Sequence, residues 1–372
     1  MIPSHAEFRM DMDALARAVA TDRDAGLRPI AVAANAGTTG TGAIDRLEEA
    51  ADFCATEGLW LHVDAAYGGF AAVTERGKQL LRGIEHADSI GLDAHKWFSQ
   101  PYEAGCLLVK DENTLKDAFA VRPDILQDTV WGANHPNFSD MGLQLSRSVR
   151  ALKVWMSVQT FGMAAFRTAV AKGMELSARA ADYVRASPVL QLLNTPALGI
   201  VCFRVNPADD DLDEEKLDKV NRTVLARMFW DDPAFISSTL LRGTFAFRMC
   251  IINHTTTWDD VRETLEAVER FGREAERFAR VMAWTVAFPA PSASARGQPF
   301  RRCTHDGSAE LSSTHSQAAW VLPRMASGRT RWDMVTLALT AGFVVGLKVG
   351  KVAPVLPLLE VKLVVPRVVA PD

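Results

Sequence analysis

The chain has 372 residues, of which 48% are hydrophobic and 23% are charged, and its formal net charge is −4. This composition is typical of a globular protein and excludes a wholly disordered or fibrous chain, and the length suggests about two domains. The mild acidity gives no electrostatic reason to expect nucleic-acid binding, which needs a concentrated basic face.

The cysteines and the two ends of the sequence predict a cytoplasmic protein without a membrane anchor. The five cysteines are scattered and form no CxxC pair, which predicts reduced thiols and neither a disulfide framework nor a metal site. The first residues have no apolar stretch behind a basic start, so no signal peptide is expected. The uncharged stretch at 334–347 has 14 residues, too few to span a bilayer.

Helices and short apolar strands alternate along the first 110 residues. We expect helices at 12–24 and 43–57 and strands at 29–34, 59–63, 89–92 and 105–109, the last of them buried. This alternation is typical of a mostly parallel sheet covered by helices on both faces. Because ligands bind beyond the carboxyl ends of such strands, the residues that follow each strand are the candidates for function.

The pattern changes in the next part of the chain. A long helix begins within 147–162, and we then expect strands at 198–205, 236–239 and 244–251 and helices at 213–228 and 257–280. Thr257 can cap the last helix together with Asp260, three residues on. This grouping predicts a smaller α+β unit.

The last 92 residues differ from the rest of the chain. Residues 281–372 carry ten basic and five acidic groups, a net +5, whereas 1–280 carry 31 and 40, a net −9. They also hold 8 of the 17 prolines and show no sustained helical or strand period. We expect a folded body at 1–280 followed by an unassigned, poorly ordered tail, either a functional appendage or an unnatural end of the translated sequence.

Three motifs follow predicted strands. They are NAGTTGTGAID at 35–45, HVDAAYGG at 62–69 and LDAHKW at 92–97. Each alone has an ordinary explanation, as a turn with a helix cap, a capping aspartate or a solvated lysine. The first motif lacks the GK[ST] of a phosphate-binding loop and the spacing of a dinucleotide fingerprint.

Taken together, Asp64 and Lys96 indicate a pyridoxal phosphate site. The aspartate precedes the lysine by 32 residues, and both follow strands of one predicted sheet. The cofactor's aldehyde needs a lysine amine, and its ring nitrogen needs a carboxylate that keeps it protonated, because the pyridinium withdraws electrons from a carbanion at Cα. The small side chains of Ala65 and Ala66 leave room for a flat ring.

The Asp64 and Lys96 motifs also carry a family resemblance. HVDAAYGG, followed by DSIGLDAHKWFSQPYEAGCLLVKD and preceded by AGTTGTGAID, closely resembles the group II pyridoxal-phosphate-dependent amino-acid decarboxylases, and most of all their aromatic-L-amino-acid branch. The resemblance covers about 1–280. It implies an α/β fold of the aspartate aminotransferase type (fold type I), a homodimer with active sites at the subunit interface, and a small amino-acid substrate.

The resemblance also implies domains and residue roles. Residues 1–155 would form the C-terminal half of the cofactor-binding large domain, and 156–280 the small C-terminal domain. Lys96 would bind the cofactor covalently, Asp64 would pair with the pyridine nitrogen, Ala66 would lie against the ring face, Thr39 would contact the ring or its phenolic edge, and His95 would help hold the phosphate.

Two further positions concern the phosphate and the substrate. Asp93 stands where relatives often have Asn or Ser, and a contact between its carboxylate and the phosphate would bring two anions together. Arg147 matches an active-site arginine of the family, with Ser146 beside it lining the substrate region. Arg147 is equally compatible with a structural ion pair.

Two departures from the family pattern bear on activity. The family's N-terminal segment, with a ring-stacking histidine and a phosphate-binding loop, would precede Met1, so we expect a truncated chain with impaired activity. In the stretch 122–128, Ile125 stands where the family has a proton-donating tyrosine. The leading interpretation is decarboxylation of an L-amino acid, aromatic for preference, to its amine and CO₂. The alternatives are other pyridoxal phosphate chemistry, such as aldehyde synthesis or transamination, and a catalytically dead fragment or partner subunit.

Overall fold

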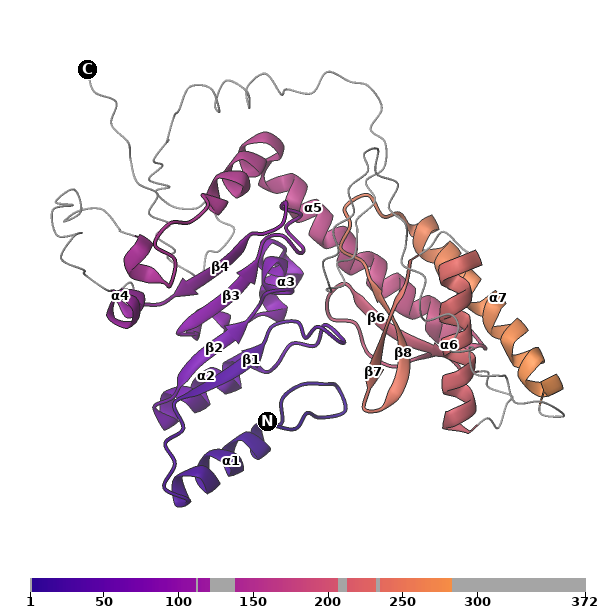
Figure 1. Ribbon diagram of the computed structural model, residues 1–372, viewed down its shortest axis with the longest axis horizontal. Helices are drawn as coiled ribbons and strands as arrows, with labels where there is room; N and C mark the ends of the chain where they lie inside the picture. The colour runs from indigo at the N-terminus through magenta and orange to yellow at the C-terminus, as the bar shows by residue number, and fades with distance from the viewer. Residues whose placement is uncertain (1, 112, 121–137, 207–212, 232–234, 283–372) are drawn as a thin grey trace, which may run out of the picture.

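The computed structural model describes residues 2–111, 113–120, 138–206, 213–231 and 235–282. Its first part contains α1 (Met12–Asp24), β1 (Ala31–Asn35), α2 (Leu47–Glu57), β2 (Trp60–Asp64), α3 (Glu75–Leu80), β3 (Ser89–Asp93), β4 (Gly105–Val109) and α4 (Thr114–Phe119). The second part contains α5 (Arg150–Ala186), β5 (Leu190–Leu192), β6 (Ile200–Val205), α6 (Glu214–Asp231), β7 (Ser237–Leu241), β8 (Thr244–Cys250) and α7 (Trp258–Met282). Figure 1 shows a sheet in each part, with α5 running from one part to the other.

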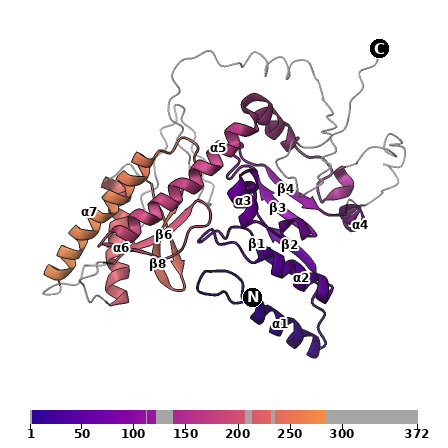
Figure 2. The same cartoon turned by 180° about the vertical axis from the view of Figure 1, so that it is seen from behind.

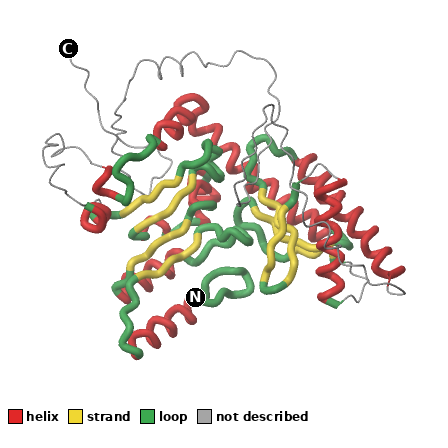
Figure 3. The backbone as a smooth tube through the Cα atoms, in the orientation of Figure 1, coloured by secondary structure: helices red, strands yellow, loops and turns green. Residues whose placement is uncertain are grey.

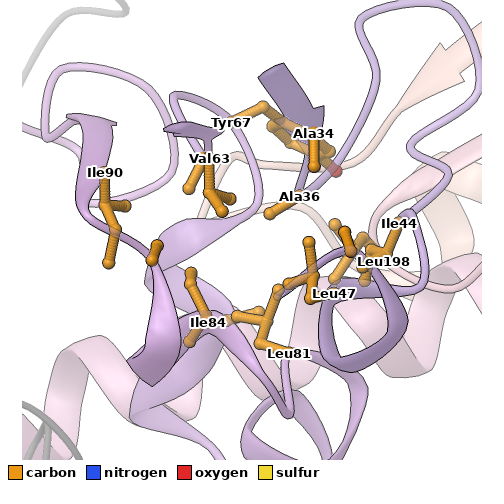
Figure 4. Packing of buried hydrophobic residues seen from close by; sticks show 14 of the residues in the cluster. Ala34, Ala36, Ile44, Leu47, Val63, Tyr67, Leu81, Ile84, Ile90 and Leu198 are labelled. Atoms are coloured by element: carbon orange, nitrogen blue, oxygen red, sulfur yellow. The ribbon is translucent and has the colours of Figure 1, made fainter. Parts of the chain in front are cut away.

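The first sheet is mostly parallel, as predicted. Its strands lie in the order β1-β2-β3-β4, and only the pairing of β3 with β4 is antiparallel. On one face, side chains such as Val32, Ala34 and Val63 are buried. Figure 4 shows this core, in which Val63 and Ala34 lie on the side of Leu47 and Leu81.

The opposite face of this sheet is open in the described chain. Alternate positions on it, including Ala31, Ala33, Asp64 and Leu107, are exposed. Helices were predicted on both faces of this sheet. Among the described residues, they cover one face. The prediction that 105–109 is a buried strand is wrong, because β4 lies at the edge of the sheet and its first three residues are exposed.

Helix α2 begins four residues later than predicted. The Asp45 carboxylate accepts hydrogen bonds from the backbone N–H of Met10 at 2.6 Å and of Asn35 at 2.7 Å, and Ile44 forms an isolated β-bridge with Ala36. These partners hold residues 43–46 out of the helix, which starts at Leu47. By contrast, α1 has the predicted bounds.

The second sheet is antiparallel, in the order β5-β6-β8-β7. Its core includes Phe203 and Phe247, which are fully buried and pack against residues of α5, α6 and α7. The predicted cap of α7 is present, since the Asp260 carboxylate accepts from the Thr257 N–H at 2.7 Å. The short strand β5 was not predicted. The proposed boundary at 155/156 falls within α5, which is interrupted at Gly162, where φ is 76°, and it stays a prediction.

Side chains from both parts fix the loops that follow the first sheet. Tyr67 Oη accepts from the Gly199 N–H at 3.0 Å, and Asn194 Nδ2 donates to the Thr41 carbonyl at 2.9 Å. The ring of Trp97 stacks on that of Tyr67 with centroids 5.2 Å apart. Figures 2 and 3 show the loops of the first sheet directed toward the second. The two parts therefore share a packed interface next to the candidate motifs.

Two buried thiols predict a loss of stability at alkaline pH. Burial raises the pKa of Cys202 from its usual 9.0 to about 12 and that of Cys54 to about 11. Above about pH 9 these thiols stay protonated in the folded protein but ionise in the unfolded chain. Each thiol should therefore lower the free energy of unfolding by about 1.4 kcal/mol for every pH unit, up to about pH 11. Below the pKa of the unfolded chain, the ionisation of these two thiols should not change the free energy of unfolding with pH.

Urea unfolding at pH 8 and pH 10.5 measures this loss. The double variant Cys54→Ala/Cys202→Ala should be less stable at pH 8 but should lose less stability on going to pH 10.5. Equal losses in both proteins would show that the thiols do not cause the alkaline destabilisation.

Candidate active site

The register of the first sheet brings the Asp64 and Lys96 motifs together. At the carboxyl end of β2, Asp64 lies between Asn35 of β1 and Gly91 of β3. The N–H of Asp93, the last residue of β3, donates to the Ala66 carbonyl at 3.2 Å. The end of β3, where the Lys96 turn begins, is therefore hydrogen-bonded to the loop after β2, as expected at one edge of a parallel sheet.

Lys96 lies in the turn that follows β3, and its amine pairs with a carboxylate. Nζ is 3.0 Å from Asp93 Oδ2, and the Lys96 N–H donates to the Asp93 carbonyl at 3.0 Å. The lysine side chain is 41% exposed, so its amine can be reached from the open side. The next residue, Trp97, is 2% exposed and anchors the turn against Tyr67. The buried ring of Trp97 thus holds the backbone next to Lys96 in place.

Asp64 ends β2 on the open face of the sheet. Its Oδ1 accepts from the Ala66 N–H at 3.1 Å, and a carboxylate has further acceptor sites for a ligand. Ala65 is fully buried, whereas Ala66 is half-buried beside Asp64. The strand end therefore offers an anionic group next to a small side chain.

His95 points its two nitrogens at different partners. Nδ1 accepts from the Ala104 N–H at 3.1 Å, so the proton of the neutral ring lies on Nε2. Nε2 is 3.8 Å from Asp93 Oδ2, and the edge of Tyr102 meets the ring at 4.9 Å between centroids. His95, Lys96 and Asp93 form one cluster in which the carboxylate pairs with the ammonium and lies near the imidazole Nε2.

The Thr39 loop is shaped by glycines and tied to the second sheet. Gly37 and Gly42 have φ of 106° and 72°, values that favour glycine. The side chain of Thr39 is exposed, and its carbonyl accepts from Arg248 Nε at 2.7 Å. Thr38 Oγ1 bonds Thr41 Oγ1 at 2.9 Å within the loop. The role of Thr39 toward a cofactor stays a prediction.

The segment of Ser146 and Arg147 precedes α5. Arg147 donates to the backbone oxygens of Phe138 at 2.8 Å and Gln144 at 3.3 Å, and Ser146 is exposed. These bonds give Arg147 a structural role within its own segment, while its substrate role stays a prediction. One turn on, Arg150 Nε donates to Glu103 Oε1 at 2.9 Å and lowers the pKa of that carboxyl, so α5 starts beside the loop that follows Lys96.

Sequence reasoning missed two contacts near the site. The first is the ion pair of Asp93 with Lys96, which was not predicted although residues three apart in a turn can form one. The second is the contact of His62, whose Nδ1 lies 2.8 Å from Ser89 Oγ. His62 comes two residues before Asp64, and side chains two apart on a strand share a face. This spacing of two residues could have predicted that His62 lies on the same face of the strand as Asp64.

The described residues hold neither a metal-binding cluster nor a membrane-spanning helix. Among them, no group of three or more His, Cys, Asp or Glu side chains is placed to hold a metal ion. No helix of the described ranges combines the length and apolar character that a membrane crossing needs.

Comparisons with known proteins identify the family of this chain. The family described as "Pyridoxal-dependent decarboxylase conserved domain" matches residues 1–206. The aromatic-L-amino-acid decarboxylase of Bacillus atrophaeus is 35% identical over 274 residues, which are 73% of this chain and 57% of the relative. A phenylacetaldehyde synthase of Arabidopsis thaliana is 30% identical over 267 residues, 72% of this chain and 54% of the relative.

A solved structure also matches. The crystal structure of Oryza sativa TDC with PLP and tryptamine has a TM-score of 0.69 and 29% identity, and the match covers 73% of this chain and 57% of that one. The chain spans about half the length of the curated relatives it matches. From the matched family, the strand-end lysine and the strand-end aspartate, we conclude that the chain belongs to the pyridoxal-phosphate-dependent amino-acid decarboxylase family, with the fold type I architecture.

Proposed function

We propose that the chain carries the lysine-bearing part of the active site of an enzyme that decarboxylates an L-amino acid, preferably an aromatic one, to its amine and CO₂. The observation that supports this most is the meeting of Asp64 and the Lys96 turn at one edge of a parallel sheet, joined by the bond from the Asp93 N–H to the Ala66 carbonyl. The similarity to the aromatic-L-amino-acid decarboxylase of Bacillus atrophaeus supports the substrate class.

The donor set of the site fits pyridoxal phosphate at its ring and aldehyde. An exposed amine, a carboxylate with spare acceptor capacity and the small Ala66 side chain match what the aldehyde, the ring nitrogen and the ring face require. When bound, the cofactor supplies a positively charged ring that stabilises the electron pair left by CO₂. Lys96 would bind it covalently and Asp64 would hold the proton on its ring nitrogen.

At the phosphate end the fit is mixed. His95 offers its Nε2–H to an anion, but the Asp93 carboxylate lies 3.8 Å from that nitrogen and would repel a phosphate placed there. Thr39 would contact the ring edge from the loop after β1. In this proposal the Asp93 carboxylate instead pairs with Lys96.

An assay of CO₂ release tests the substrate class. The protein supplied with pyridoxal phosphate should have its highest kcat/KM on aromatic amino acids, when these are compared with histidine, glutamate and 2,4-diaminobutyrate. A preference for glutamate or diaminobutyrate would contradict the aromatic assignment while leaving the reaction type intact.

Ile125 supports a second candidate, which is aldehyde synthesis. The residue lies outside the described residues, and it stands where the family resemblance places a tyrosine that would return a proton after CO₂ leaves. A positioned general acid contributes about 10² to 10⁴ in rate, so its loss gives a slower oxidation by O₂ time to compete. That oxidation consumes one O₂ and one water for each amino acid and yields aldehyde, CO₂, ammonia and hydrogen peroxide. The relatives include a phenylacetaldehyde synthase.

The ratio of aldehyde to amine measures this effect. We expect the wild-type chain to give some aldehyde and the Ile125→Tyr variant to give more amine at the expense of aldehyde, with peroxide falling in step. An unchanged ratio would show that Ile125 does not decide the product. Ile125→Val is the matched control, since it keeps the position aliphatic.

An exposed apolar segment supports a homodimer. Leu143 is 92% exposed, Leu145 70%, Val149 69% and Phe161 68%, all before or within the first turns of α5. The segment adjoins the loop that follows Lys96, so a second copy seated here would lie next to the site. Sedimentation should show a dimer that Leu143→Asp/Leu145→Asp converts to a monomer, whereas the control Thr223→Asp, at an exposed position of α6, should leave the dimer intact. A monomeric wild-type chain would contradict the proposal.

A further inference from the structure

Three polar side chains on the open face of β2 and β3 form a hydrogen-bonded chain. Trp60 Nε1 donates to Ser89 Oγ at 2.9 Å, and Ser89 Oγ lies 2.8 Å from His62 Nδ1. The register places Ser89 directly beside His62. Ser89 is buried and the two rings are half-buried. The position of the imidazole is therefore fixed from the neighbouring strand.

The bond from Trp60 favours one tautomer of the His62 ring. An indole N–H can only donate, so Ser89 Oγ accepts from Trp60 and has its own proton available for an acceptor. In the described chain, the other bond of this hydroxyl is the one with His62 Nδ1. The tautomer that uses this hydroxyl proton has Nδ1 as the acceptor and the proton of the neutral ring on Nε2.

The protonated edge of His62 lies on the side of Asp64. A Cβ built on Gly91 would lie 3.8 Å from both Cε1 and Nε2 of His62, so this edge of the ring lies over Gly91. Gly91 is the register partner of Asp64. His62 and Asp64 also share a face of β2, as the alternating burial of the strand shows. The His62 Nε2–H is thus directed to the strand end that carries the Asp64 carboxylate.

We propose that His62, held by Ser89 and Trp60, is a positioning residue that donates its Nε2–H to the Asp64 carboxylate when that carboxylate turns toward a bound cationic ring. In the described chain, the two side chains form no hydrogen bond or ion pair with each other, and Asp64 Oδ1 accepts from the Ala66 N–H. This inference rests on the proposed function, because it assigns Asp64 as the partner of the cofactor's ring nitrogen. A neutral donor fixes the carboxylate without adding a charge that would compete with the ring. Supporting hydrogen bonds of this kind hold a site group in its productive geometry.

A double-mutant cycle on cofactor binding tests the proposal. Binding of pyridoxal phosphate is followed by its visible absorption, and the covalent adduct is trapped with borohydride. We expect His62→Leu and Ser89→Ala to weaken binding by about tenfold, and His62→Gln, which keeps a donor, to stay within about threefold of wild type. In the Asp64→Asn background, His62→Leu should change binding by less than about twofold, because its partner is gone.

Controls separate positioning from a general effect on the sheet. Val109→Ala lies on the same face of β4, opposite Ser89, and should leave binding unchanged. If His62→Leu weakens binding equally in the wild-type and Asp64→Asn backgrounds, His62 has a purely structural role and the proposal is wrong. If His62→Leu fails to fold, Ser89→Ala supplies the same cycle. A wild-type chain that binds no pyridoxal phosphate would overturn the proposed function itself. If the wild-type chain binds the cofactor but the effects of the two substitutions simply add, only the role of His62 is wrong.

Discussion

Replacing Lys96 with alanine should abolish covalent attachment of pyridoxal phosphate and lower kcat by about 10⁴-fold or more. The side chain of Lys96 is partly exposed at the strand edge, and its backbone is anchored by buried Trp97. In the described chain, the other groups of its cluster are a carboxylate and an imidazole, and neither can replace an amine in a carbonyl addition. The visible absorption band of the bound cofactor and the rate of CO₂ release measure the two effects.

Lys110→Ala is the matched control for this prediction. Lys110 follows β4 on the same sheet, and its side chain is exposed. The Lys110→Ala variant should keep the absorption band and the turnover of the unmodified chain. Loss of the band in the Lys110 variant together with its survival in the Lys96 variant would reverse the assignment.

Replacing Asp64 with asparagine should lower kcat by at least about 100-fold, or about 2.7 kcal/mol, while leaving some cofactor bound. Asparagine keeps the shape of the side chain and can still accept from the Ala66 N–H. It has no negative charge to hold the proton on the ring nitrogen, so the ring would lose its power to withdraw electrons. The measurement is kcat alongside the fraction of cofactor bound.

Asp64→Glu and Asp52→Asn are the controls for charge and for a generic surface change. The glutamate variant keeps the charge at a shifted position and should retain more activity than the asparagine variant. Asp52 lies on the exposed face of α2 and should tolerate the change. An Asp64→Asn enzyme with undiminished turnover would contradict the role of this carboxylate.

The sequence predicted those parts of the fold that local signals determine. Short apolar runs located β1, β2 and β3 to within two residues, and the capping pair Thr257 and Asp260 located the start of α7. Helix α2 started later than predicted because the partners of Asp45 lie 10 and 35 residues away. The exposure of β4 depends on its edge position in the sheet, which periodicity within the strand does not reveal.

The candidate site shows the same division. Asp64 and Lys96 could be paired from the sequence because each follows a strand of a parallel sheet, and the register then brought them to one edge. The bonds that surround them could not be read from the sequence. Ser89 meets His62 across 27 residues, and this contact depends on the register of two strands. The ion pair of Lys96 with Asp93 depends on the shape of a turn.

Peptide mapping after borohydride reduction tests directly whether Lys96 is the residue that binds the cofactor. The full chain is incubated with pyridoxal phosphate, reduced, digested and analysed by mass spectrometry. We expect the pyridoxyl group on Lys96, in the peptide that also contains His95, and its loss from that peptide in the Lys96→Ala variant. A pyridoxyl group found mainly on Lys110 or Lys153, with Lys96 unmodified, would contradict the assignment of the active site.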